Sequence, residues 1–270
     1  MSLHLTGNPW DGLFPAQPFA FRFGARPGDP CRFFADSADH AQRVQCRREI
    51  LDAHPERHLL HTARAKPAIS ELATWAGLPG GDCHTLALHW EQDFLVLLPD
   101  ADGQPVFVAG AVCFPSSWAP KEKLGLTVPA IHSSVPTLNE RLGTRIGSFL
   151  AGVRPEKAWE RVNWGVSAAA ELNQHPALGL ARLKPPFALD QLWVRREDQL
   201  LFRLPRSDAL IFGINVTNIS VSEIAADAQG RAGLRQTLET MPAEIAAYKG
   251  LSAGRPLLLD LLADDGRCSR

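Results

Sequence analysis

The sequence lacks the short motifs by which many electron-carrying and nucleotide-binding proteins are recognised. Its five cysteines are odd in number and form no C-x-x-C pair, which argues against a disulfide framework, a structural zinc site and an iron–sulfur cluster. The sequence contains neither a Walker phosphate loop nor a glycine-rich dinucleotide motif. Direct binding of ATP or NADPH is therefore not predicted for this chain.

Long apolar runs and a strong charge of one sign are also missing. The longest apolar run, Phe94 to Pro99, has the length of a strand and not of a membrane span. The segment from Met1 to Phe23 lacks the basic start and apolar run of a signal peptide. The formal net charge of −1 does not suit a nucleic-acid binder that relies on a positive surface. We therefore expect a cytoplasmic protein with no membrane and no nucleic-acid partner.

The composition is that of a globular protein with a sizeable core. Of the 270 residues, 45% are apolar and 21% are charged, which excludes an intrinsically disordered chain. The 21 glycines and 21 prolines indicate many loops. Because the sequence has no internal repeat and no low-complexity linker, we expect a single elaborated domain over residues 1–270.

Hydrophobic periodicity predicts helices before and after a central group of strands. The expected helices cover residues 39–54, 68–76, 83–92, 138–151 and 225–248. The expected strands cover residues 94–98, 106–114, 192–204 and 208–217, and the turn chemistry of Asp100 to Gly103 joins the first two as an antiparallel hairpin. Clustered strands flanked by helices are typical of an α+β fold with an antiparallel sheet.

His132 is the first candidate functional residue. It lies in a loop between Pro129 and Pro136, beside the apolar Ile131 and Val135. An imidazole held by a stiff loop can coordinate a metal or a haem iron through one ring nitrogen. A loop histidine can equally bond a backbone carbonyl, and the local sequence leaves both roles open.

The strand that begins at Trp193 is the second candidate feature. Alternation places Trp193, Arg195, Glu197, Gln199 and Arg203 on one face. Such a face is either solvated or buried. Buried charges cost several kcal/mol each unless they are paired, so a buried Arg195 and Glu197 need protein partners or a polar ligand. The second alternative describes a pocket wall for a small charged substrate.

Six ordered sequence blocks between Val112 and Asn218 carry a family resemblance. They read C-F-P-S-S-W from Cys113, K-L-G from Lys123, I-H-S-S-V-P from Ile131, R-V-N-W from Arg161, R-R-E-D-Q from Arg195 and R-L-P-R-S from Arg203. The sequence thereby resembles the haem-dependent oxidative N-demethylase family. Weaker matches cover residues 23–30, 91–93 and 248–250, so the resemblance extends over most of the chain.

The resemblance implies a fold and a set of site residues. The fold is a PAS-like antiparallel sheet with helical N- and C-terminal extensions: an arm and helices over 1–80, a haem-binding core over 81–224, and a C-terminal helix and tail over 225–270. It implies haem b with His132 as axial iron ligand. Asn163 and Trp164 are further candidates for binding the cofactor, with a structural role as the alternative. It also makes Arg195, Glu197 and Gln199 the candidate catalytic residues around oxygen and amine.

The implied activity is that of a haem-dependent monooxygenase. It removes a methyl group from a small secondary or tertiary amine, dimethylamine-like, and releases formaldehyde. Dioxygen is the co-substrate, and the electrons come from a separate reductase that carries NADPH, FMN and a 2Fe–2S centre. The alternatives are a non-catalytic PAS-like haem sensor and a haem-free protein that binds another small molecule in the same pocket, because a shared fold does not decide function.

Overall fold

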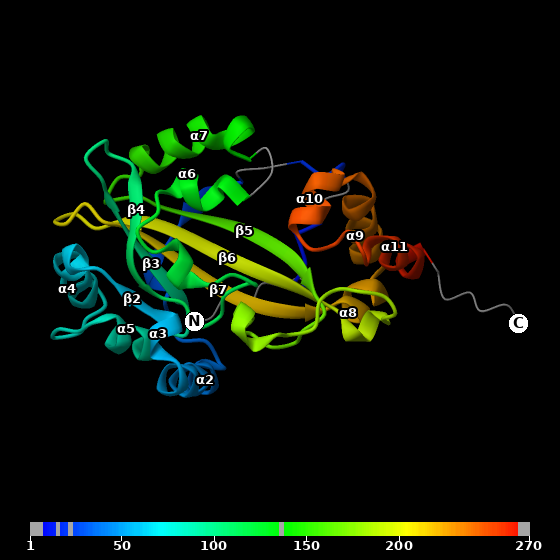
Figure 1. Cartoon of the computed structure of the whole chain (residues 1–270), viewed down its shortest axis with the longest axis horizontal. Coiled ribbons are helices and arrows are strands. Elements are labelled where there is room, and N and C mark those ends of the chain that lie inside the picture. The colour runs from blue at the N-terminus through cyan, green and yellow to red at the C-terminus, as the bar shows by residue number, and fades with distance from the viewer. Residues whose placement is uncertain (1–7, 15–16, 21–23, 135–137, 264–270) are drawn as a thin grey trace, which may run out of the picture.

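A long antiparallel sheet forms the centre of the molecule (Figure 1). The computed structural model describes residues 8–14, 17–20, 24–134 and 138–263, so Val135, Pro136 and Cys268 lie outside the described residues. Within these residues the sheet has seven strands in the order β1-β5-β6-β7-β3-β4-β2. The strands are β1 Arg26–Gly28, β2 Leu59–His61, β3 Asp93–Pro99, β4 Pro105–Ala111, β5 Ala158–Ser167, β6 Trp193–Arg203 and β7 Leu210–Ser220.

Helices cover the sheet from both sides and from one end. They are α1 Pro30–Phe33, α2 His40–Ala53, α3 Pro55–His58, α4 Lys66–Trp75, α5 Cys83–His89, α6 Val128–Ile131, α7 Leu138–Gly152, α8 Val221–Ala226, α9 Ala228–Thr240, α10 Ala243–Tyr248 and α11 Arg255–Ala263. In Figure 1, α6 and α7 lie on one side of the sheet, α2, α4 and α5 on the other, and α8 to α11 beyond the end of β7. The predicted α+β class with an antiparallel sheet is confirmed.

The predicted hairpin is formed by β3 and β4. Their last pair is Pro99 with Pro105, and the side chain of Asp100 accepts hydrogen bonds from the backbone N–H groups of Asp102 and Gln104. Gly103 has a φ of 77°, a conformation that costs glycine little because it has no Cβ. The turn residues that the sequence supplies therefore fix the register of the hairpin.

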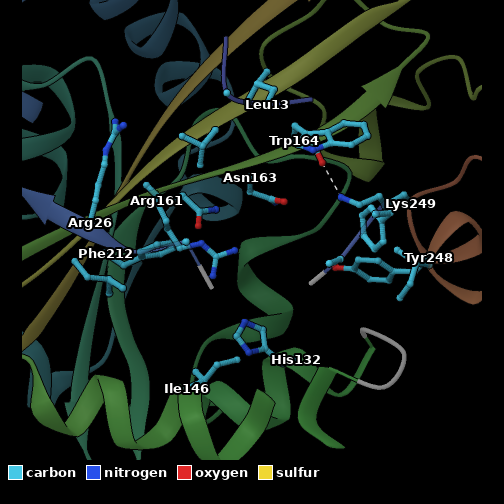
Figure 2. Close-up of a pocket in the computed structure, with 18 of the residues that line it drawn as sticks. Leu13, Arg26, His132, Ile146, Arg161, Asn163, Trp164, Phe212, Tyr248 and Lys249 are labelled. Carbon is cyan, nitrogen blue, oxygen red and sulfur yellow. Dashed lines mark hydrogen bonds between the residues drawn. The ribbon is translucent and has the colours of Figure 1, made fainter. Parts of the chain in front are cut away.

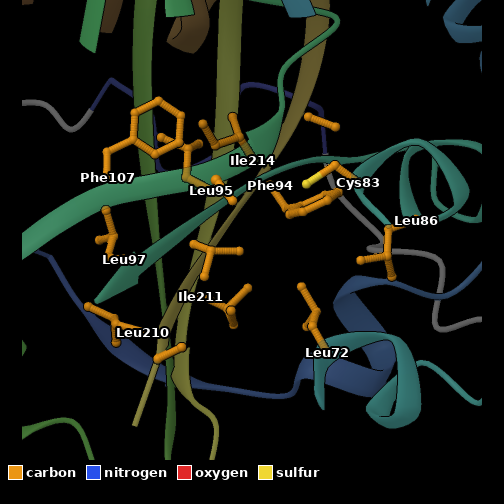
Figure 3. Close-up of a cluster of buried hydrophobic side chains, with 14 of the residues drawn as sticks. Leu72, Cys83, Leu86, Phe94, Leu95, Leu97, Phe107, Leu210, Ile211 and Ile214 are labelled. Carbon is orange, nitrogen blue, oxygen red and sulfur yellow. The ribbon is translucent and has the colours of Figure 1, made fainter. Parts of the chain in front are cut away.

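Apolar side chains fill both sides of the central strands. Phe94 and Ile211 face Leu72 of α4 and Leu86 of α5 across a cluster that also contains Cys83 (Figure 3). Burial raises the pKa of the Cys83 thiol to about 12, so it stays protonated at neutral pH. A second cluster joins the sheet to the C-terminal helices through Val194, Ile219, Val221, Ile224, Leu234 and Leu238.

The expected single helix over residues 225–248 is wrong, because the segment forms the end of α8, then α9 and α10. Asp227 begins a new helix, since its side chain accepts a hydrogen bond from the backbone N–H of Gly230. Pro242 separates α9 from α10, because proline has no N–H to donate inside a helix. The short β1 and β2 and the ten-residue β5 were not predicted from the sequence.

A buried ion pair connects the helical layer to the sheet. Arg47 of α2 is fully buried, donates to Asp93 at the start of β3, and donates through Nε to the carbonyl of Ala87 at 2.7 Å. Asp93 also accepts the backbone N–H groups of Cys113 and Phe114 at 2.7 and 2.9 Å. This one carboxylate therefore holds α2, β3 and the segment after β4 together.

We expect Arg47→Met to lower the free energy of unfolding by about 3–5 kcal/mol, because it leaves the Asp93 carboxylate buried without its counter-ion. Urea unfolding followed by circular dichroism measures the change. Arg48→Met is the matched control, since Arg48 is exposed on the same helix and its replacement should cost less than about 0.5 kcal/mol. Equal unfolding midpoints for the two variants would contradict the role given to the pair.

Candidate functional site

A cavity of about 610 Å³ lies between the sheet and the helices α6 and α7 (Figure 2). This volume falls in the range of small-molecule and cofactor sites. The sheet contributes Leu95, Leu97, Leu201 and Phe212, and the α6–α7 side contributes Val128, Ile131, His132, Ile146 and Leu150. Other walls come from Leu13 and Phe19 near the N-terminus and from Thr237, Ile245, Tyr248 and Lys249 of the C-terminal helices. The cavity thus takes residues from outside the 81–224 segment as well as from within it.

His132 lies directly after α6 and points into this cavity (Figure 2). Thr127 caps α6 by accepting from the N–H of Ala130, and Pro129 lies in the first turn, so the chain before His132 is held in place. The His132 Nδ1 atom is buried and has no hydrogen-bond partner among the described residues. No described backbone carbonyl therefore accepts a hydrogen bond from Nδ1, as one would in a purely structural histidine.

Burial is the main cause that lowers the pKa of His132, and the positive charge of Arg161 lowers it further. The imidazole is consequently neutral at pH 7, which is the form that binds iron or another metal. No group of three or more His, Cys, Asp or Glu side chains suited to a metal ion occurs in the described part of the chain. A single neutral imidazole in the cavity is consistent with haem binding, because one axial side chain is enough to hold haem iron.

Strand β5 forms the wall opposite His132. Arg161, Asn163 and Trp164 of β5 line the cavity, and the register places Arg161 beside Gln199 and Asn163 beside Glu197 on β6. Burial lowers the pKa of Arg161, although the guanidinium remains charged at neutral pH. Strand β1 pairs with β5 only from Ala158 to Glu160, so the cavity-lining part of β5 lies beyond its pairing with β1.

Glu197 organises the polar part of this wall. Its Oε2 atom accepts hydrogen bonds from Asn163 Nδ2 at 3.1 Å and Gln199 Nε2 at 2.9 Å, and its Oε1 atom accepts one from the Ser116 hydroxyl. Both amides line the cavity, whereas Glu197 is not among the lining residues. Since the amide NH₂ groups donate to Glu197, their carbonyl oxygens are left to accept hydrogen bonds from a ligand.

Arg195 lies one step further from the cavity. Its Nε donates to the Ser116 hydroxyl at 2.7 Å, and its Nη2 donates to the carbonyls of Phe114 and Leu172 at 2.7 and 2.6 Å. Burial lowers the pKa of Arg195 to about 10, so it keeps its charge at neutral pH. Backbone carbonyls and Ser116, not a ligand, satisfy this guanidinium.

The predicted site residues thus fall into two groups. His132, Asn163, Trp164 and Gln199 line one cavity, and Arg195 and Glu197 lie behind its wall, joined to it through Ser116 and the two amides. Sequence reasoning did not select the cavity residues Arg161, Tyr248 and Lys249. Two features of the sequence could have indicated them: Arg161 begins the R-V-N-W block, and Tyr248 and Lys249 lie in the weaker family match over residues 248–250.

The fold and the cavity define an α+β protein that holds a neutral histidine over a cofactor-sized space. Residues 81–259 match the model of the family described as haem-dependent oxidative N-demethylase, alpha subunit-like. The chain belongs to this family. In the parts of the chain that the structure describes, no helix combines the length and apolar character needed to cross a membrane.

We expect Glu197→Gln to lower the free energy of unfolding by about 1–3 kcal/mol, because an NH₂ group would replace an oxygen that accepts hydrogen bonds in a crowded polar cluster. Urea unfolding measures the loss. Glu223→Gln on the surface of α8 is the matched control and should leave the midpoint unchanged. A Glu197→Gln variant as stable as its control would show that the cluster does not depend on the carboxylate.

Proposed function

We propose that this chain binds haem b in the cavity, with His132 as the axial ligand, and oxidatively removes a methyl group from a small secondary or tertiary amine. The observation that carries the proposal is that the His132 side chain, held in its neutral form because burial lowers its pKa, lines the 610 Å³ cavity of a member of this family. Asn163 and Trp164 would contact the bound cofactor from the β5 side.

Haem supplies the oxygen activation and the redox chemistry when it is bound. The overall reaction consumes one dioxygen, two electrons and two protons, and yields the demethylated amine, formaldehyde and water. The electrons must come from outside, since the sequence predicts no nucleotide or iron–sulfur site. We therefore propose a separate reductase partner carrying NADPH, FMN and a 2Fe–2S centre, in keeping with a family named for one subunit of an enzyme.

The chain's own contribution is binding, orientation and exclusion of water. Leu95, Leu97, Leu201 and Phe212 provide an apolar surface against which a flat ligand can lie. The carbonyl oxygens of Asn163 and Gln199 can accept the N–H of an amine, because Glu197 fixes the orientation of both amides. Gln199 is thus proposed to contact the substrate, and Glu197 and Arg195 are proposed to act through the residues that they position.

We expect His132→Ala to abolish the Soret band of the purified protein, because the substitution removes the axial nitrogen. Absorbance spectra of wild type and variant, each reconstituted with hemin, provide the measurement. Added imidazole should restore much of the band by filling the space that the ring leaves.

His84→Ala is the matched control for this spectrum, since His84 is exposed on α5 and should leave the Soret band intact. Circular dichroism shows whether His132→Ala retains the wild-type fold. A folded His132→Ala protein with an unchanged Soret band would overturn the ligand assignment.

Turnover separates the enzyme from a haem sensor. With a ferredoxin and its reductase as surrogate electron donors, we expect the haem-loaded protein to release formaldehyde from a methylated amine, in an amount equal to the amine consumed. Titration with the amine should also shift the haem spectrum. Binding of carbon monoxide or oxygen without any response to a panel of secondary and tertiary methylamines would favour the non-catalytic sensor.

A further inference from the structure

The charged side chains that line the described part of the cavity are of one sign. Arg26, Arg161 and Lys249 line it, and no described Asp or Glu does so. Glu197 lies behind the wall, where Ser116, Asn163 and Gln199 already donate to its oxygens. A simple methylamine is a cation at neutral pH, and a site for a bare cation is expected to present a carboxylate to it. This cavity presents the opposite charge.

Lys249 is the cation on the C-terminal side of the cavity. Its ammonium donates to the carbonyl of Trp164 at 2.6 Å and lies 5.2 Å from the centre of the Trp164 ring. An ammonium has three N–H donors, and this carbonyl uses one of them. No described carboxylate lies within ion-pair distance of Lys249, whereas Arg26 is paired with Glu160.

Tyr248 stands beside Lys249 at the end of α10. Figure 2 shows both side chains on the same side of the cavity, with Arg161 and His132 on its other sides. Tyr248 is 47% exposed; its partial burial and the charge of Glu197 raise the pKa of its hydroxyl, which keeps its proton and can donate a hydrogen bond. A cationic donor and a neutral donor next to each other form a suitable site for one carboxylate.

We propose that Lys249, assisted by the Tyr248 hydroxyl, binds a carboxylate inside the cavity. The proposal rests on the proposed function and deepens it, because the carboxylate belongs either to the cofactor or to the substrate. One is a propionate of haem b, and the other is the carboxylate of the substrate, which would then be an N-methylated amino acid and not a simple methylamine.

The energetics of Lys249 agree with an anionic ligand. Burial lowers the pKa of Lys249 to about 8; the negative charge of Glu197 opposes this effect, and the positive charge of Arg161 adds to it. The side chain therefore carries its charge at pH 7 in surroundings that disfavour it. A carboxylate in contact with the ammonium would offset this cost and gain a charge-assisted hydrogen bond.

The first part of the test locates the carboxylate on the cofactor. Haem-free wild type and Lys249→Met are titrated with protohaem and with its dimethyl ester, which lacks free carboxylates, and the Soret band gives the dissociation constants. If a propionate is the ligand, Lys249→Met weakens protohaem binding about ten-fold and leaves ester binding unchanged.

The second part locates it on the substrate. Haem-loaded and haem-free proteins are titrated calorimetrically with N,N-dimethylglycine and with dimethylamine. If the substrate carries the carboxylate, Lys249→Met weakens binding of dimethylglycine about ten-fold and does not weaken binding of dimethylamine. In both parts Lys249→Arg should restore most of the affinity, and Tyr248→Phe should give a smaller loss. Lys157→Met, on the exposed surface, should match the wild type.

The inference is overturned if wild type prefers neither protohaem over its ester nor dimethylglycine over dimethylamine, or if Lys249→Met weakens the ester and dimethylamine equally with the carboxylates. Tyr248→Phe and Lys249→Arg keep the test valid should Lys249→Met fail to fold. If hemin gives the wild type no Soret band, the proposed function is wrong. Calorimetry on the haem-free protein then still shows whether Lys249 binds a carboxylate.

Discussion

The buried carboxylate of Asp93 is the interaction on which the polar interior of this protein depends. Asp93 is buried, holds the equally buried Arg47, and accepts the two backbone N–H groups that follow β4. Those contacts fix the segment that contains Phe114 and Ser116. A buried carboxylate with a full set of donors is stable, whereas the same group with a partner missing is costly, so the arrangement is sensitive to each member.

A continuous polar network leads from that segment to the cavity. Arg195 donates to the Phe114 carbonyl and to Ser116, Ser116 donates to Glu197, and Glu197 receives the amides of Asn163 and Gln199. The C-F-P-S-S-W and R-R-E-D-Q blocks of the sequence therefore belong to one structure. Their charged residues set the orientation of two neutral amides at the cavity wall, a division between support and contact that is common in ligand sites.

Much of the fold was predictable because its elements obey simple patterns. The β3–β4 hairpin has clear apolar runs and turn residues, and a proline-containing turn joins the apolar ends of β6 and β7. Strand β5 was missed although Val162, Trp164 and Val166 alternate along it, because Glu160, Arg161 and Asn163 give the segment a polar character. His132 and Gln199 could be placed at the site from the sequence. The carbonyl partners of Arg195 and the approach of Lys249 to Trp164, 85 positions earlier, arise only from tertiary folding.

The origin of the cavity walls also sets an order of events during synthesis. The walls include Leu13 at one end of the described chain and Lys249 near the other, with strands and helices from the middle between them. A ribosome-bound chain that has produced only the sheet therefore has an open half-site with its apolar face in water. The complete wall exists only after α10 has been synthesised and Lys249 has reached Trp164 of β5, so the full binding site forms late in synthesis.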